Sequence, residues 1–282
     1  MAEIGAMIRR DVPPEHVGIH AASLAPVFNE LWVVEDVPYA GGVSQLAEVL
    51  RHTDECIVGH GIAPAPFRNP MALAMEWATL ARVYPGRLRC GIGHGVQTWM
   101  ADIGERVASP LVLLEETAVA VQALLHGEDP KLTGRYRQIS GWELEFPPDQ
   151  VPGLSLGAVG PKTLALSGRI ADGTIIPEGH GPDHVERAVE IIAEARAAAG
   201  RTDPHRLTLF VGFFYGPDND RPPPPSEEMI QGWEITGDSP SRVADRIGEL
   251  LETEVDSIVL VPYGDPQAQL ELVATDVLPQ LG

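Results

Sequence analysis

Short apolar runs rich in β-branched residues alternate with longer amphipathic stretches along almost the whole chain. The predicted strands cover residues 4–9, 30–34, 56–61, 88–92, 154–158, 173–177, 207–214 and 257–262. The predicted helices cover residues 14–25, 43–52, 71–83, 110–126, 161–170, 182–199, 240–253 and 266–278. This order predicts βαβ units built around a parallel sheet.

Proline marks the beginning of several predicted helices. It stands in the first turn, directly after a small residue, at Ser109-Pro110, Gly160-Pro161, Gly181-Pro182 and Ser239-Pro240. The first turn of a helix leaves its N–H groups unpaired, so proline is tolerated there and is typical of a helix N-terminus.

Eight strand–helix pairs in 282 residues match the size of a (β/α)8 TIM barrel. A doubly wound sheet would carry a glycine-rich turn after its first strand, whereas residues 4–9 lead into Asp11-Val12-Pro13-Pro14. We therefore predict an α/β fold in which residues 1–282 form a single (β/α)8 barrel domain.

Two stretches interrupt the alternation. Residues 134–148 have the spacing of apolar residues expected of a hairpin, which would be a small insertion before the fifth strand. Residues 216–233, with four consecutive prolines at 222–225, are predicted to form a loop after the seventh strand.

The charge and hydropathy of the chain exclude several classes of partner. Forty acidic residues against 20 basic ones give a net charge of −20, which repels the phosphates of nucleic acids. No apolar run approaches the roughly 20 residues that span a bilayer, and the first residues do not resemble an export signal. Cys56 and Cys90 lie in apolar runs and are too few to staple a fold of this size. We expect a cytoplasmic protein that binds neither nucleic acid nor membrane.

The residues that follow the predicted strands are unusual. In a barrel of this kind the site lies at the C-terminal ends of the strands. The residues at those ends are Glu35-Asp36, Gly59-His60-Gly61-Ile62, Gly93-His94-Gly95, Gly157-Ala158-Val159-Gly160 and Pro177-Glu178. Glycines at three strand ends would let a large flat ligand approach the backbone, whose N–H groups could bind its carbonyl or phosphate oxygens.

Three motifs at these strand ends carry a family resemblance. They are VGHGIAPAPFRNP at residues 58–70, YPGRLRCGIGHG at residues 84–95, and LGAVGPK at residues 156–162 with SGRIADG at residues 167–173. Together they resemble the bacterial luciferase-like oxidoreductases, including the F420-dependent, methylene-tetrahydromethanopterin reductase-like members. The resemblance implies a barrel that binds coenzyme F420 (a deazaflavin) or FMN and performs two-electron chemistry at C5 or N5 of the ring.

The resemblance also implies roles for particular positions. It places a non-prolyl cis peptide between Gly61 and Ile62, at a bulge that supports the back of the cofactor ring. The cofactor-binding residues that it implies are Gly61, Ile62, Gly93, His94, Gly95, Gly157, Ala158, Val159 and Gly160. Lys162 and Arg68 are the nearest basic residues by motif for the anionic tail of a deazaflavin.

The adjacent carboxylates Glu35 and Asp36 are the predicted catalytic pair, together with His94 as an alternative proton donor. Two carboxylates at one sheet edge repel each other, so burial would raise the pKa of one of them, as a proton donor requires. An ordinary structural role is the competing interpretation for the pair, and also for His60 and His94, since buried histidines are often only hydrogen-bonded.

Other residues are interpreted more simply. Arg68 is expected to form a salt bridge at the beginning of the third helix, and Asp172 to cap or turn the chain before the sixth strand. Trp99 could wall a substrate pocket. The histidine pairs His16/His20 and His180/His184 each lack an adjacent third ligand, so no metal site is predicted.

Three departures from the family narrow the substrate. Relatives that reduce methylene-tetrahydromethanopterin have a glutamate where this chain has Met7 or a neighbour, and relatives that oxidise sugar phosphates have a histidine in place of Asp36. Pro177-Glu178 offers nothing that suits a phosphate.

These observations predict an oxidoreductase that uses F420 for hydride transfer to or from a small organic substrate. An FMN-dependent luciferase-like monooxygenase and a non-catalytic flavin-binding homologue remain as alternatives. The resemblance also implies a homodimer, because family members commonly pair through their second and third helices.

Overall fold

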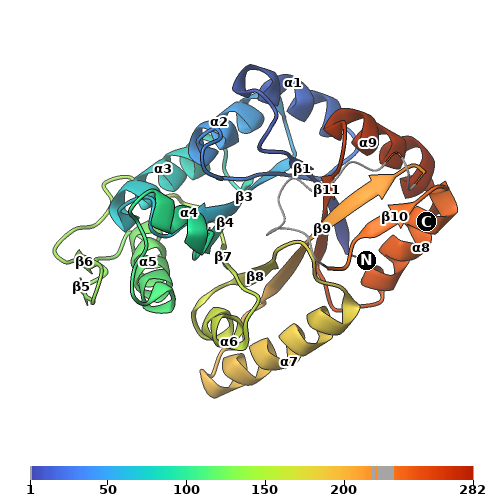
Figure 1. Cartoon of the computed structure of the whole chain (residues 1–282). Helices are drawn as coiled ribbons and strands as arrows, with labels where there is room; N and C mark the ends of the chain where they lie inside the picture. Colours follow the sequence, from blue (N-terminus) through green and yellow to red (C-terminus); the bar gives the residue numbers. More distant parts are fainter. Residues whose placement is uncertain (1, 218–219, 221–231, 282) are drawn as a thin grey trace.

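Parallel strands close into a barrel with helices around its outside (Figure 1), in a computed structural model that describes residues 2–217, 220 and 232–281. The eight barrel strands within these residues are β1 (Glu3–Ile8), β2 (Glu30–Val33), β3 (Ile57–Pro64), β4 (Leu88–Gly93), β7 (Leu154–Gly157), β8 (Gly173–Ile176), β9 (Arg206–Tyr215) and β11 (Ser257–Pro262). Their order is β11-β1-β2-β3-β4-β7-β8, and β9 closes the ring by pairing with both β8 and β11. The predicted (β/α)8 barrel is confirmed.

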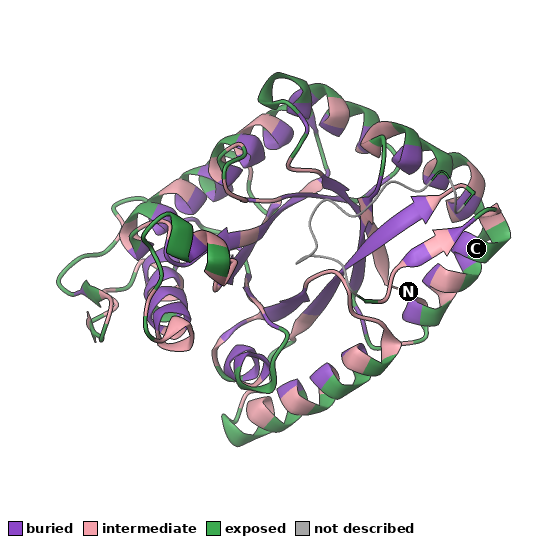
Figure 2. Cartoon of the chain, viewed as in Figure 1, coloured by how far each residue is buried: buried purple, intermediate pink, exposed green. Residues whose placement is uncertain are grey.

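Each predicted helix is also present and covers the outside of the barrel. The helices are α1 (Pro14–Leu24), α2 (Gly42–His52), α3 (Pro70–Val83), α5 (Pro110–Leu125), α6 (Pro161–Ile170), α7 (Pro182–Ala198), α8 (Pro240–Leu251) and α9 (Pro266–Leu272). Figure 2 shows their buried faces turned toward the strands and their exposed faces outward, which is the arrangement that an amphipathic pattern produces. Within the described residues, no helix is both long and apolar enough to cross a membrane.

Two short elements were not predicted. The helix α4 (Gln97–Asp102) follows β4, and the strand β10 (Ile235–Gly237) pairs in parallel with the C-terminal part of β9. Segments of six and three residues are too short for hydrophobic periodicity to distinguish them from loop.

The insertion before the fifth barrel strand contains the predicted hairpin, but its paired part is shorter and begins earlier than expected. Its strands are β5 (Leu132–Thr133) and β6 (Gln138–Ile139), and residues 140–153 are irregular. The carboxylate of Glu116 accepts hydrogen bonds from the N–H groups of Arg135, Tyr136 and Arg137. This α5 side chain therefore takes the place of further strand pairing at the hairpin tip.

The predicted loop at residues 216–233 lies mostly outside the described residues. Its two ends are described and are both hydrogen-bonded. Gly216 N–H donates to the Gly237 carbonyl at 2.9 Å, and Trp233 N–H donates to the Gly179 carbonyl at 3.1 Å.

The barrel interior has its own small core, formed by Met7, Trp32, Ile175, Phe210 and Val259. The Trp32 and Phe210 rings meet edge to face, with centroids 5.3 Å apart. These side chains fill the barrel below the C-terminal ends of the strands, so the space above them is left for the site.

The N-terminal end of the barrel is closed by polar networks. Glu30 is fully buried and accepts hydrogen bonds from Ser257 Oγ (2.7 Å), Arg206 (2.7 Å) and Arg89 Nε (3.0 Å). Burial alone would raise the pKa of Glu30, but Arg206, hydrogen bonds and Arg89 hold it below its usual value.

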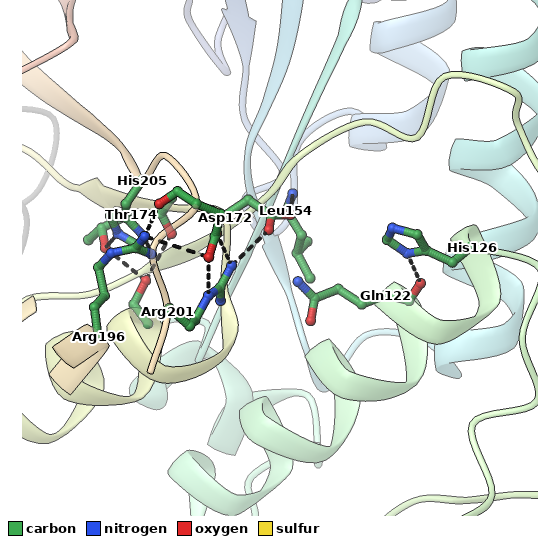
Figure 3. A network of polar contacts seen from close by, with 11 residues as sticks. Gln122, His126, Leu154, Asp172, Thr174, Arg196, Arg201 and His205 are labelled. Atoms are coloured by element: carbon green, nitrogen blue, oxygen red, sulfur yellow. Dashed lines mark hydrogen bonds and ion pairs between the residues drawn. The ribbon is translucent and has the colours of Figure 1, made fainter. Parts of the chain in front are cut away.

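A second network at this end joins β7 and β8 to the segment before β9 (Figure 3). Asp172 accepts from Leu154 N–H at 3.0 Å and from Arg201 at 3.2 Å, which confirms its predicted role as a residue that fixes the chain before the sixth barrel strand. Beside it, His205 lies 2.9 Å from Thr174 Oγ1 and 3.3 Å from Arg196.

Candidate active site

A cavity of about 330 Å³ opens among the C-terminal ends of the barrel strands. The structure brings every predicted catalytic and cofactor-binding residue to its lining, namely Glu35, Asp36, Gly61, Ile62, Gly93, His94, Gly95, Gly157, Ala158, Val159 and Gly160, whereas Arg68 and Lys162, predicted for an anionic tail, are not among the lining residues. Trp99, Thr163, Pro177, Glu178 and Phe210 are among the other lining residues. The volume lies within the range of small-molecule sites, which is about 300–1,000 Å³.

The floor of the cavity is formed around Ile62. The Gly61–Ile62 peptide is cis, as predicted, and the β3–β4 register shifts between His60 and Ala63. A Cβ atom on Gly157 would lie 2.6 Å from Ile62 Cδ1, and one on Gly93 would lie 3.0 Å from Ile62 Cγ2. These two glycines therefore make room for the Ile62 side chain. They affect the space for a ligand only through the position of that side chain.

Gly160 differs from those glycines because a Cβ there would meet nothing within 4 Å. It lies directly before α6, whose N-terminus has no side-chain cap. This is the part of the lining where backbone is open to a ligand and where a helix N-terminus favours negative charge.

Glu35 is held as an anion beside the cavity. Arg68 donates two hydrogen bonds to its carboxylate, at 2.6 and 2.7 Å, and Gly42 N–H donates a third at 3.0 Å. Burial alone would raise the pKa of Glu35, but the hydrogen bonds and charge of Arg68 and the Gly42 hydrogen bond together lower it. The expected salt bridge of Arg68 is therefore present, and its partner is a predicted catalytic residue.

His60 lies beneath Glu35 and does not reach the cavity. It is fully buried, Trp77 Nε1–H donates to its Nδ1 at 3.2 Å, and its Nε2 lies 3.6 Å from Glu35 Oε2. Because indole can only donate, His60 Nδ1 is the acceptor and the neutral ring carries its proton on Nε2. Burial lowers the pKa of His60 to about 4, which favours the structural interpretation of this histidine.

Asp36 belongs to a different ion pair. Arg10 donates to its carboxylate at 3.0 Å, and the guanidinium of Arg10 lies over the rings of Tyr39 and Trp99, 5.1 and 5.6 Å from their centroids. The pKa of Asp36 is raised, because burial outweighs the Arg10 contacts and the charge of Glu35 adds to it. The adjacent carboxylates thus have opposite pKa shifts.

His94 lies on the β4 side of the cavity, with Nε2 3.1 Å from Thr163 Oγ1. Gln97 Nε2 donates to the carbonyls of His94 and Gly95, at 3.1 and 3.2 Å, and Gly95 has a φ of +70°, which glycine adopts without strain. Burial lowers the pKa of His94, so at neutral pH its ring is uncharged.

Two polar residues of this region were given no catalytic or binding role from the sequence: Arg10, and Glu178, which was named only as a strand-end residue unsuited to a phosphate. Arg10 lies two residues after β1 and Glu178 two residues after β8, so position at a strand end was the available signal. Burial raises the pKa of Glu178, and the charge of Asp36 raises it further.

The barrel and the cavity lined by strand-end glycines define the class of protein: a (β/α)8 barrel with a cavity of small-molecule size at the C-terminal ends of its strands. The sequence model of the family described as luciferase-like monooxygenase matches residues 27–222. The chain belongs to this family.

Curated relatives cover most of the chain. It is 28% identical over 259 residues to a 5,10-methylenetetrahydromethanopterin reductase of Methanolobus tindarius. The aligned part covers 91% of this chain and 78% of the relative. It is 31% identical over 174 residues to an F420-dependent glucose-6-phosphate dehydrogenase of Microbacterium testaceum. The aligned part covers 60% of this chain and 52% of the relative.

Solved structures share the fold over the full chain. The coenzyme F420-dependent tetrahydromethanopterin reductase of Methanopyrus kandleri has a TM-score of 0.84 at 21% identity, with 100% of this chain and 99% of that one covered. The oxygenating constituent of 3,6-diketocamphane monooxygenase of Pseudomonas putida, in complex with FMN, has a TM-score of 0.77 at 17% identity, with 100% and 99% covered. Both likenesses establish the barrel fold.

Proposed function

We propose that the protein is an F420-dependent oxidoreductase that transfers a hydride to or from a small organic substrate. The observation that carries this proposal is the apolar side chain of Ile62 on the cavity lining, which lies within the β3 register shift and packs against Gly93 and Gly157. The relatives that are named as F420-dependent enzymes support the choice of cofactor.

The residues of the cavity fit a deazaflavin. Ile62 would support the back of the ring, and the backbone from Gly157 to Gly160, followed by the uncapped α6 N-terminus, would face its phosphate-bearing side chain. Lys162 is the exposed cation next to this segment, whereas Arg68 is already bound by Glu35. Lys162 is therefore the better of the two predicted residues for an anionic tail.

When bound, F420 would supply the hydride carrier of the reaction. The chain itself would exclude water with Trp99, Pro177 and Phe210 and would provide polar groups on two sides. His94 offers an uncharged ring nitrogen from β4, and Asp36 offers a carboxyl group with a raised pKa. Glu35, ionised and bound by Arg68, would fix the loop between β2 and α2.

A parallel fluorescence titration with F420 and FMN tests the cofactor. We expect F420 to bind more tightly; tight binding of FMN with none of F420 would transfer the proposal to the FMN-dependent monooxygenase alternative, which the FMN-bound neighbour supports. Turnover of a substrate panel with reduced F420 then separates an enzyme from a non-catalytic flavin-binding homologue.

We also propose that two copies of the chain pair through the outer face of α3. A groove of about 1070 Å³ lies between α3 and residues 138–146, and Trp142 and Phe146 on its edge are 69% and 66% exposed. The groove carries both signs of charge, with Arg82 on α3 and Glu143 on the insertion, so the same patch on two copies is self-complementary. Light scattering on wild type and Trp142→Glu tests this: a dimer that becomes a monomer is expected, and a monomeric wild type contradicts it.

We further propose a cytoplasmic location and a small-molecule substrate, with no nucleic-acid or membrane partner. The net charge of −20 supports the first exclusion. The two buried free thiols, Cys56 and Cys90, agree with a reducing compartment.

A further inference from the structure

Two carboxyl groups face the cavity from strands that are not neighbours. Asp36 follows β2 and Glu178 follows β8, and neither strand pairs with the other. Asp36 has a counter-ion in Arg10. In the part of the chain that the structure describes, no cation forms a salt bridge with Glu178.

The remaining charged and titratable groups around the cavity are already engaged. On β1, Arg9 is bound by Asp11 and the Pro262 carbonyl. On the β2–α3 side, Glu35 is neutralised by Arg68. On β4, His94 lies against Thr163, and after β8, His180 Nδ1 lies 2.9 Å from the Pro177 carbonyl.

Among the described residues, the counter-ion near these two carboxyl groups is the Arg10 guanidinium, which is salt-bridged to Asp36. Burial is the main cause that raises the pKa of Glu178. The negative charge of Asp36 raises it further, and the charge of Arg10 acts in the opposite direction.

We propose that Glu178 is the catalytic acid–base residue of this site, and that its place on the cavity lining, with the Asp36 carboxyl on the same lining and no salt bridge to a described cation, keeps it protonated until the reaction takes the proton. The inference rests on the proposed function, which it deepens by naming the proton carrier.

Reduction of a polar double bond adds one hydride and one proton to the substrate. A bound reduced deazaflavin would supply the hydride and be oxidised. The Glu178 O–H bond would break, its proton would go to the substrate atom that becomes negative, and Glu178 would be left as a carboxylate. In the reverse direction the Glu178 carboxylate accepts the proton of a substrate hydroxyl as the hydride leaves.

The other candidates are less suited to this role. Glu35 is an anion with three hydrogen-bond donors around its carboxylate, so it has no proton to give. Asp36 also has a raised pKa, but its carboxylate is already engaged by Arg10 at 3.0 Å, whereas Glu178 has no such partner among the described residues. His94 is uncharged at neutral pH, since burial lowers its pKa, and it can orient a substrate but has no extra proton to release.

The first test needs no cofactor. Carbon-13 NMR of the side-chain carboxyls, assigned with Glu178→Gln, follows the titration of Glu178 in the free protein. We expect Glu178 to titrate above an ordinary glutamate, and Asp36→Asn to move its midpoint downward because a negative charge is removed. An ordinary midpoint that Asp36→Asn leaves unchanged overturns the proposal, whatever the cofactor.

The second test uses the cofactor-loaded enzyme and the substrate that the wild type turns over fastest. Glu178→Gln is expected to lower turnover about 100-fold or more, to abolish its pH dependence in the range where Glu178 titrates, and to leave F420 affinity within about threefold. Glu186→Gln, the same change at an exposed position on α7, is the matched control and should behave as wild type.

The two failures are distinguishable. If wild type binds no F420, the proposed function fails while the carboxyl titration still reports on Glu178. If F420 binds tightly and Glu178→Gln turns over within twofold of wild type at every pH, the proton assignment is overturned and the proposed function stands.

Discussion

Arg68 donates two hydrogen bonds to the carboxylate of Glu35, and both residues are largely buried, with 22% and 5% of their side chains exposed. The pair joins the beginning of α3 to the loop after β2, at the edge of the cavity. The pKa of the neighbouring Asp36 is raised mainly by burial, and the negative charge of the ionised Glu35 adds to this rise. Arg68 therefore keeps one of two adjacent acids ionised while burial favours the protonated form of the other.

Arg68→Met should destabilise the protein by about 3 kcal/mol at pH 7, because it leaves the Glu35 carboxylate buried without its partner. Urea denaturation measures the loss. Without Arg68 the folded-state pKa of Glu35 would lie above its unfolded value. Lowering the pH from 7 to 5 should therefore reduce the difference in unfolding free energy between Arg68→Met and the wild type.

The matched control for this change is Arg169→Met. Arg169 also binds a glutamate, Glu115, at 2.9 Å, but about half of each side chain is exposed, and such pairs contribute about 1 kcal/mol or less. A loss in Arg68→Met no larger than in Arg169→Met would contradict the importance of the buried pair. Adding Glu35→Gln to Arg68→Met should recover most of the stability.

The stability of the wild type should fall as the pH drops below 6.5, partly because of His60. Burial holds the pKa of His60 at about 4 in the folded state, against 6.5 for an ordinary histidine, so between these pH values the unfolded chain binds the proton first. The contribution of the neutral His60 to the unfolding free energy is fully present above pH 6.5. It is lost as the pH falls toward 4, by up to about 1.4 kcal/mol per pH unit.

His60→Gln tests this contribution, because glutamine can still accept from Trp77 and donate toward Glu35. Between pH 6.5 and 5, the unfolding free energy of His60→Gln should change less steeply with pH than that of the wild type. The difference in slope should correspond to nearly one bound proton. His126→Gln, at an exposed position on the C-terminal side of α5, should leave the slope unchanged. Equal slopes for wild type and His60→Gln would show that His60 is already protonated in the fold.

The barrel could be predicted because each strand is a short apolar run and several helices have a proline in their first turn. The position of the cavity followed from the rule that parallel strands present their C-terminal ends together. The ion pairs could not be read in this way: Glu35 and Arg68 are 33 positions apart, and Arg10 and Asp36 are 26 apart. Partner choice at such distances depends on how loops pack over the strand ends, which no local pattern encodes.

Gly61 illustrates a residue whose place was predicted but whose surroundings were not. A Cβ on Gly61 would lie 2.4 Å from Phe210 Cζ and 2.8 Å from Trp32 Cε3, inside the barrel. Gly61→Ala should therefore cost about 1–3 kcal/mol of stability by overpacking, and Phe210→Leu in the same chain should recover part of it.

The contrasting change is Gly160→Ala, where a Cβ meets nothing within 4 Å and φ is −79°. Its effect on the unfolding free energy should stay within about 0.5 kcal/mol. The affinity for F420 should decrease, because the added methyl group would fill the space beside the exposed backbone. Denaturation and fluorescence titration of both variants check the pair. The reverse result, with Gly160→Ala destabilised and Gly61→Ala as stable as wild type, would contradict the packed surroundings of Gly61 and the open surroundings of Gly160.

Gly157→Ala tests whether Ile62 is the floor of the cofactor site. The new methyl group would lie 2.6 Å from Ile62 Cδ1, the free end of a flexible side chain, so Ile62 should turn toward the cavity with a modest cost in stability. A raised floor displaces a flat ligand, and we expect F420 affinity to fall about tenfold, which is about 1.4 kcal/mol. Ile62→Val removes Cδ1 and leaves Cγ2, which is 3.3 Å from the same point, so the double variant should regain most of the affinity. Titration of the two single variants and the double variant forms a cycle, and additive losses would place the ligand elsewhere than over Ile62.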